Sequence, residues 1–139
     1  MKYIRVVSII LLCFFMVRCA EKHQVSVTSL LDVLQESWEK RDASQSAVIS
    51  TALIELLVIT PEKTMKFLVK NGDITSELMR RMQYDVFTDY SGKDKEQLRI
   101  LKENAIYALK KCACKNKEES DARDDLINVL NRIEIRSID

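Results

Sequence analysis

The chain has 139 residues, with 22 basic and 21 acidic side chains, one histidine and four cysteines. A formal net charge of +1 provides no global basic field, so binding to nucleic acid through its phosphates is not expected. There are only two glycines and one proline, and apolar residues recur mostly at three and four positions. This pattern predicts an all-α fold.

The first residues have the layout of an export signal. Lys2 and Arg5 precede the apolar run 6–17, which is shorter than the roughly 18 residues that a spanning helix needs. The next residues, MVRC ending at Cys19, resemble the signal segment of bacterial lipoproteins, although Arg18 stands where a small residue is usual. This resemblance covers residues 1–20 only. It implies acylation at Cys19 and attachment to a periplasm-facing membrane.

Two alternatives to the lipoprotein remain open. One is simple secretion, with cleavage after Ala20, and the other is an uncleaved N-terminal anchor. We expect a signal segment over 1–19, a tether over 20–28 and one helical domain over 29–139. Loss of the first 18 residues would leave 19 basic and 21 acidic side chains, a net charge of −2.

The stretch 43–60 is predicted to be the central helix of the domain. Glu55 is its only charged residue, and eight of its last twelve residues are apolar. Asp42 with Gln45 three residues later has the spacing of an N-terminal capping box. A helix that is apolar nearly all round is expected to be packed among the other helices.

Five further helices are expected around it. The first covers 29–41 and the third starts with a cap at Thr60 and stops at Asn71-Gly72. The fourth runs from Asp73 to Val86, and TDYSGK, residues 88–93, is a predicted loop. Asp94 is expected to cap the fifth helix and Ser120 the last, after a polar segment over 115–119, with Arg136 near its end.

These elements predict either a compact six-helix bundle or a short stack of antiparallel helix pairs. The caps at Ser29 and Asp42 are repeated at Thr60 and Asp73, a shift of 31 positions in both cases. In this respect the domain weakly resembles short HEAT-like helical repeats.

Cys112 and Cys114 are the most specific chemical feature of the domain. Lys110, Lys111 and Lys115 surround them with positive charge, which could lower a thiol pKa. They are interpreted as a packing residue and a helix-end thiol, with a structural disulfide or redox or metal chemistry as alternatives. A metal would need two more ligands, and the only histidine, His23, lies in the tether. We therefore expect no metal site and no cofactor.

Two other features could contribute to function. Glu55 is either exposed on a narrow solvent side, paired with a cation, or a perturbed functional carboxylate. A candidate partner surface has aromatic and arginine side chains, the composition of binding hot spots, although a loop folded back on a helix end has the same composition. Its residues are Arg80, Arg81, Tyr84, Phe87 and Tyr90.

The sequence contains no glycine-rich phosphate loop, no G-x-S-x-G elbow and no H-E-x-x-H pair. We therefore predict a non-enzymatic, exported and membrane-anchored helical domain that binds an unidentified protein, as envelope accessory or immunity-like lipoproteins do. The alternative is a thiol-dependent redox or metal-binding protein using Cys112 and Cys114.

Overall fold

The computed structural model describes residues 27–138, apart from the side chains of Ala43 and Ser44. The chain divides into two units, 1–33 and 34–139, and each is considered by itself. The predicted signal segment and Cys19 lie outside the described residues. Helix α2, Val27–Glu39, crosses the boundary between the units. This helix was predicted over 29–41. It begins two residues earlier, at Val27, so residues 27 and 28 are helical rather than part of a tether, and it ends before Arg41, at Glu39.

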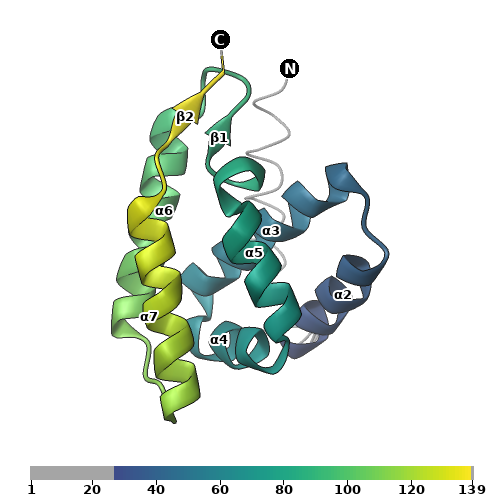
Figure 1. Cartoon of the computed structure of the whole chain (residues 1–139), viewed down its shortest axis with the longest axis vertical. Coiled ribbons are helices and arrows are strands. Elements are labelled where there is room, and N and C mark those ends of the chain that lie inside the picture. Colours follow the sequence, from purple (N-terminus) through teal and green to yellow (C-terminus); the bar gives the residue numbers. More distant parts are fainter. Residues whose placement is uncertain (1–26, 139) are drawn as a thin grey trace, which may run out of the picture. The chain divides into compact units, whose positions relative to one another are not determined.

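The described residues form six helices, which confirms the all-α prediction (Figure 1). After α2 come α3, Ala43–Ile59, and α4, Pro61–Lys70. They are followed by α5, Gly72–Asp85, α6, Lys95–Lys111, and α7, Lys117–Arg132. Two short strands complete the description: β1, Thr88–Asp89, and β2, Arg136–Ser137.

Helix α3 begins with the expected capping box. The Asp42 side chain accepts a hydrogen bond from the Gln45 N–H at 2.8 Å, and the Gln45 side chain accepts one from the Asp42 N–H at 3.2 Å. The helix contacts α4, α5 and α6 through one face, where Leu53, Ile54 and Leu57 are at most 1% exposed. It is not enclosed on all sides, because Val48 is 68% exposed. The expectation of a helix buried all round was therefore wrong for its outer face.

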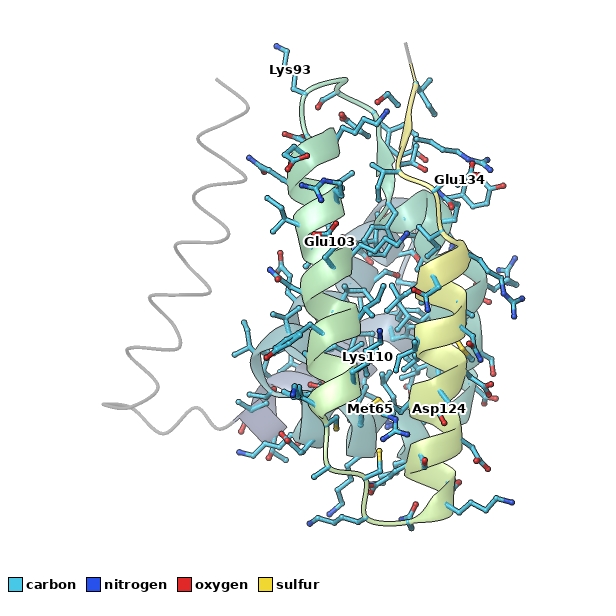
Figure 2. The ribbon with its side chains drawn as sticks, turned by 90° about the vertical axis from the view of Figure 1, so that its left-hand side faces the viewer. Met65, Lys93, Glu103, Lys110, Asp124 and Glu134 are labelled. Carbon is cyan, nitrogen blue, oxygen red and sulfur yellow. The ribbon has the colours of Figure 1, made fainter. Side chains whose placement is uncertain are left out.

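The helices of residues 34–138 form a bundle rather than a stack of sequential pairs. In a stack each repeat would contact only its neighbours in the chain. Here α3 packs on α6 and α4 packs on α7, and α6 and α7 also lie side by side (Figures 1 and 2). Helices α3 to α7 all supply large side chains that are less than 2% exposed: Leu53, Ile54, Leu57, Met65, Leu68, Leu78, Met82, Leu109, Leu126 and Leu130. This is a single core.

After α2, the helix starts differ from the predictions at four places. Helix α5 begins at Gly72, so its N-cap is Asn71 and not Asp73. The Thr60 and Asp94 side chains make no capping hydrogen bond, although each residue occupies the N-cap position. Helix α7 begins at Lys117, because Asn116 rather than Ser120 accepts the capping bond from the Glu119 N–H at 2.8 Å. The predicted polar linker 115–119 is therefore partly helical.

A two-stranded parallel ribbon was missed by the sequence analysis. β1 falls within the predicted loop 88–93, and β2 contains Arg136, which was expected near the end of a helix. Thr88 pairs with Arg136, and the Ile138 N–H donates to the Asp89 carbonyl at 3.1 Å. Two residues per strand carry no alternating pattern that a sequence could reveal, so only tertiary contact identifies this ribbon.

Candidate functional site

The predicted partner surface at the end of α5 is only partly exposed. Tyr84 is 60% exposed and Tyr90 is 65% exposed, and the Tyr90 hydroxyl donates to the Tyr84 carbonyl at 3.2 Å. Arg80 lies one turn before Tyr84, and its side chain is 67% exposed. Phe87 is fully buried, so its assignment to the surface was wrong. We call Arg80, Tyr84 and Tyr90 the tyrosine surface.

Phe87 is buried because the chain turns towards the core at the end of α5. Val86 occupies the helix C-cap, and the N–H groups of Val86 and Phe87 both donate to the Met82 carbonyl. The Phe87 carbonyl then accepts from the Arg136 N–H at 3.4 Å, at the start of the ribbon. The sequence groups Phe87 with its aromatic neighbours, whereas the turn sends it into the core.

The two arginines of α5 have different surroundings. Arg80 makes two hydrogen bonds to Glu77, at 3.0 and 2.6 Å, on the surface. The hydrogen bond from Arg80 lowers the pKa of Glu77, with weaker help from the charges of Arg81 and Arg41. Arg81 instead makes a bidentate contact with Asp85, at 3.0 and 3.1 Å. Both arginines are paired with an acid, but Arg80 is 67% exposed and Arg81 only 31%, so Arg80 is the more accessible of the two to a partner.

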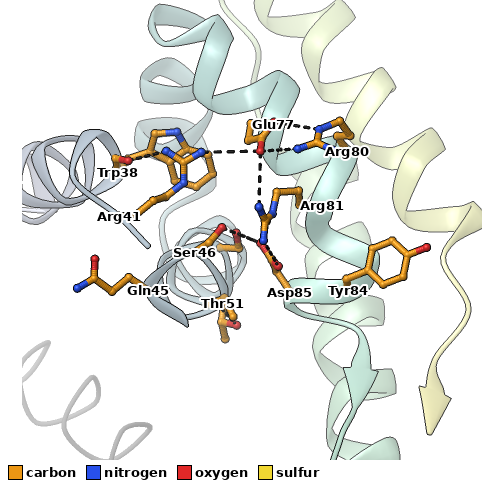
Figure 3. A network of polar contacts seen from close by, with 12 residues as sticks. Trp38, Arg41, Gln45, Ser46, Thr51, Glu77, Arg80, Arg81, Tyr84 and Asp85 are labelled. Atoms are coloured by element: carbon orange, nitrogen blue, oxygen red, sulfur yellow. Dashed lines mark hydrogen bonds and ion pairs between the residues drawn. The ribbon is translucent and has the colours of Figure 1, made fainter. Parts of the chain in front are cut away.

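Behind the tyrosine surface, Asp85 joins α5 to α3 (Figure 3). The buried hydroxyls of Ser46 and Ser50 donate to the same Asp85 oxygen, at 2.9 and 3.3 Å. The Asp85 side chain is 7% exposed. A buried carboxylate is tolerated when it is paired and hydrogen-bonded, as here. This network was not predicted from the sequence, although two serines four residues apart on an apolar helix could have indicated it.

A second contact extends the network to the residues before α3. The Arg41 guanidinium lies 3.9 Å from the centre of the Trp38 ring and 3.8 Å from Glu77 (Figure 3). It also donates to the Trp38 carbonyl. Arg41 therefore links Trp38 to Glu77, through a cation–π contact with one and an ion pair with the other.

The loop after β1 is organised by a buried carboxylate. Asp89 is 2% exposed and accepts hydrogen bonds from the Ser91 and Asp94 N–H groups, at 2.9 and 2.8 Å, and from the Ser91 hydroxyl. Burial opposes ionisation, but these hydrogen bonds outweigh it and lower the pKa of Asp89 to about 2. Gly92 has a φ of 68°, which suits glycine. The loop that carries Tyr90 is thus fixed by its own hydrogen bonds.

Cys112 and Cys114 are both free thiols. Cys112 is 5% exposed at the end of α6, and the Cys114 sulfur lies 4.0 Å from the Cys112 carbonyl oxygen. Burial raises the pKa of the Cys112 thiol to about 11, and Cys114 and Glu62 add to the shift. Because the thiolate is the reactive form, this environment disfavours Cys112 as a nucleophile. The buried position of Cys112 agrees with the interpretation of it as a packing residue.

Glu55 is half-buried on the outer face of α3, and its side chain makes no hydrogen bond or ion pair within residues 27–138. Burial raises the pKa of its carboxyl. Of the three interpretations of Glu55, pairing with an arginine or lysine is therefore not found in this described part of the chain.

Within the described residues no group of three or more histidine, cysteine, aspartate or glutamate side chains is placed to hold a metal ion. Among the same residues, no helix is long and apolar enough to span a membrane. Comparison with protein-family models, curated proteins and solved structures gave no match.

Proposed function

We propose that this chain is an exported, membrane-anchored helical domain that binds a protein partner through the tyrosine surface. The observation that supports binding is the exposure of two adjacent tyrosines, at 60% and 65%, with an exposed arginine one turn away. Tyrosine and arginine are enriched in binding hot spots, because they offer a large contact area together with hydrogen-bonding groups.

The surroundings of the tyrosine surface favour binding by a preformed surface. The Tyr90 hydroxyl is held on the Tyr84 carbonyl, and the Asp89 hydrogen bonds fix the loop. Asp85, next to Tyr84, anchors the end of α5 to α3 through Ser46 and Ser50. Side chains on a fixed backbone lose less conformational freedom on binding, which increases affinity.

Site-specific crosslinking in intact cells tests this function. A photoreactive benzoyl-phenylalanine replaces Tyr84 in the full-length chain, and the matched control replaces Tyr107 on α6. Tyr84 is 60% and Tyr107 is 65% exposed. A discrete crosslinked protein is expected from position 84 and not from position 107, and Arg80→Ala is expected to weaken it. Equal products from both positions, or none from position 84, would contradict the proposal.

Export and anchoring are tested separately, because they rest on the N-terminal sequence pattern. Cells grown with labelled fatty acid should transfer the label to the protein, and Cys19→Ala should abolish the transfer. Absence of label on the unaltered protein would exclude the lipoprotein and leave secretion or an uncleaved anchor.

A further inference from the structure

We propose that the outer face of α3 docks an amphipathic helix of a partner protein, with a lysine or arginine of that helix placed against Glu55. This inference goes beyond the proposed function, since it concerns a second surface. The residues of this face, which we call the α3 stripe, are Val48, Ala52, Glu55 and Ile59.

The α3 stripe follows the surface of the helix. Its residues are spaced by four, three and four positions, which places them along one side of a helix. Val48 is 68% and Ile59 is 46% exposed, and the two residues between them are half-buried. Rows of side chains spaced by three and four on one helix pack into the grooves of a second helix, so this row suits a helical occupant.

The α3 stripe and the tyrosine surface are separate. At about 100° per residue, Glu55 lies on the side of α3 opposite to Ser46. Ser46 faces α5 through its bond to Asp85, at 2.9 Å. A partner on the α3 stripe would therefore approach from the side that faces away from α5.

The chemistry of the stripe indicates the charge of its occupant. Glu55 is the only charged residue in the 17 residues of α3, and it has no partner within residues 27–138. A carboxylate among apolar side chains loses hydration when the surface is covered, and an opposing cation compensates for that loss. The complementary helix is thus apolar along one side with one basic residue near the middle.

A second copy of the same chain fits this face less well. If two α3 stripes packed together, two Glu55 carboxylates would enter one interface, and α3 supplies no cation to pair with them. Like charges placed together in an interface are unfavourable. Charge complementarity therefore favours a different protein over self-association.

Binding of defined peptides tests the inference. The full-length protein is placed in lipid nanodiscs, with empty nanodiscs as the blank, and titrated with helical peptides of about 18 residues, five turns. The peptides share one apolar side and differ only in a central lysine, glutamine or glutamate. The unaltered protein is expected to bind the lysine peptide about tenfold more tightly than the glutamate peptide.

Variants of α3 make the test specific. Glu55→Lys is expected to reverse the preference, and Glu55→Gln to remove it while binding persists. Val48→Lys should weaken all three peptides, whereas Ile100→Lys on α6, where Ile100 is 45% exposed, should change nothing. Circular dichroism checks that each variant is folded. If Glu55→Lys does not fold, Glu55→Gln alone tests the role of the Glu55 charge.

Three results would overturn the inference: no binding to the unaltered protein, equal affinity for the three peptides, or a preference that Glu55→Lys or Glu55→Gln leaves unchanged. A dimer detected by sedimentation, and strengthened by Glu55→Gln, would assign the stripe to a second copy instead. Crosslinking at Tyr84 is independent of these outcomes, so the proposal for the α3 stripe and the proposal for the tyrosine surface can be disproved separately.

Discussion

Helices α3 and α6 have the same length, 17 residues, and pack against each other, yet they use their surfaces differently. Glu55 is the only charge of α3, whereas α6 exposes acidic and basic residues along its length, among them Glu103 and Lys110 (Figure 2). α6 buries only Ala105, Ala108 and Leu109. The comparison shows that α3 supplies several large core side chains, whereas α6 supplies Leu109 and two alanines and keeps a charged outer side.

The two helices also begin differently. α3 is capped by its own neighbours, Asp42 and Gln45. The start of α6 depends on Asp89, which lies five residues before Asp94 and accepts its N–H at 2.8 Å. A capping box can be recognised in a sequence, because its residues are three positions apart. The hydrogen bond from Asp94 to Asp89 depends instead on how the loop folds.

The largest effect should follow from a cavity under α3. Leu57→Ala removes a side chain that is 0% exposed and is expected to cost about 3 kcal/mol of unfolding free energy. Ile100→Ala on α6, at 45% exposure, should cost less than about 1 kcal/mol. Urea denaturation of both variants measures the difference, and equal losses would contradict the assignment of the core to α3.

A smaller loss is expected at the network on the inner side of α3. Asp85→Ala leaves the buried Ser46 and Ser50 hydroxyls without their acceptor and Arg81 without its partner. Because Arg81 is 31% exposed and can be hydrated, we expect about 2 kcal/mol rather than the full cost of a buried charge. Glu96→Ala, which removes an exposed partner of Arg99 on α6, should leave the unfolding midpoint unchanged.

Substitutions at the starts of α3 and α6 should cause smaller losses of stability. Asp42→Ala removes the capping bond to the Gln45 N–H and should cost about 1 kcal/mol. Asp94→Ala should cost less than half of that, because the Asp94 side chain caps no N–H group of α6. The same denaturation measurement applies. A larger loss at Asp94 would show that α6 depends on this carboxylate after all.

The pH dependence of stability that Asp89 contributes should be the smallest of these effects above about pH 4, because its carboxyl stays ionised there. Its pKa is lowered from 3.8 to about 2, so its contribution to stability is complete above pH 3.8 and is lost as the pH falls towards 2. Unfolding midpoints measured at several acidic pH values should fall across this window. In the Asp89→Asn variant this part of the fall should be missing. If the variant lost stability in acid to the same extent as the unaltered protein, protonation of Asp89 would not contribute to acid unfolding.

Much of the fold could be predicted, because it rests on local patterns. The helices of residues 43–59 and 61–70 follow apolar spacing, the Asp42 capping box and Pro61, all of which act within a few residues. The cap of α7 was misplaced because Asn116 and Ser120 both have side chains that can cap, and only the folded chain selects Asn116.

The candidate site was less predictable. Tyr84 and Tyr90 were expected at a surface and are exposed, whereas Phe87 between them is buried. Composition alone gives these three residues the same preference for contact, and the turn after α5 decides which one faces the core. Asp85 was missed because its partners, Ser46 and Ser50, lie 39 and 35 positions earlier in the chain.

The sequence by itself determined that the chain is helical, where its central helix lies and which residue caps it, since spacing and capping depend on residues within one or two turns. Only the tertiary structure decided which face of α3 is covered, that Phe87 enters the core and that Asp89 pairs with the end of the chain. Those outcomes depend on contacts between distant segments, whose free energies appear only when the helices pack together.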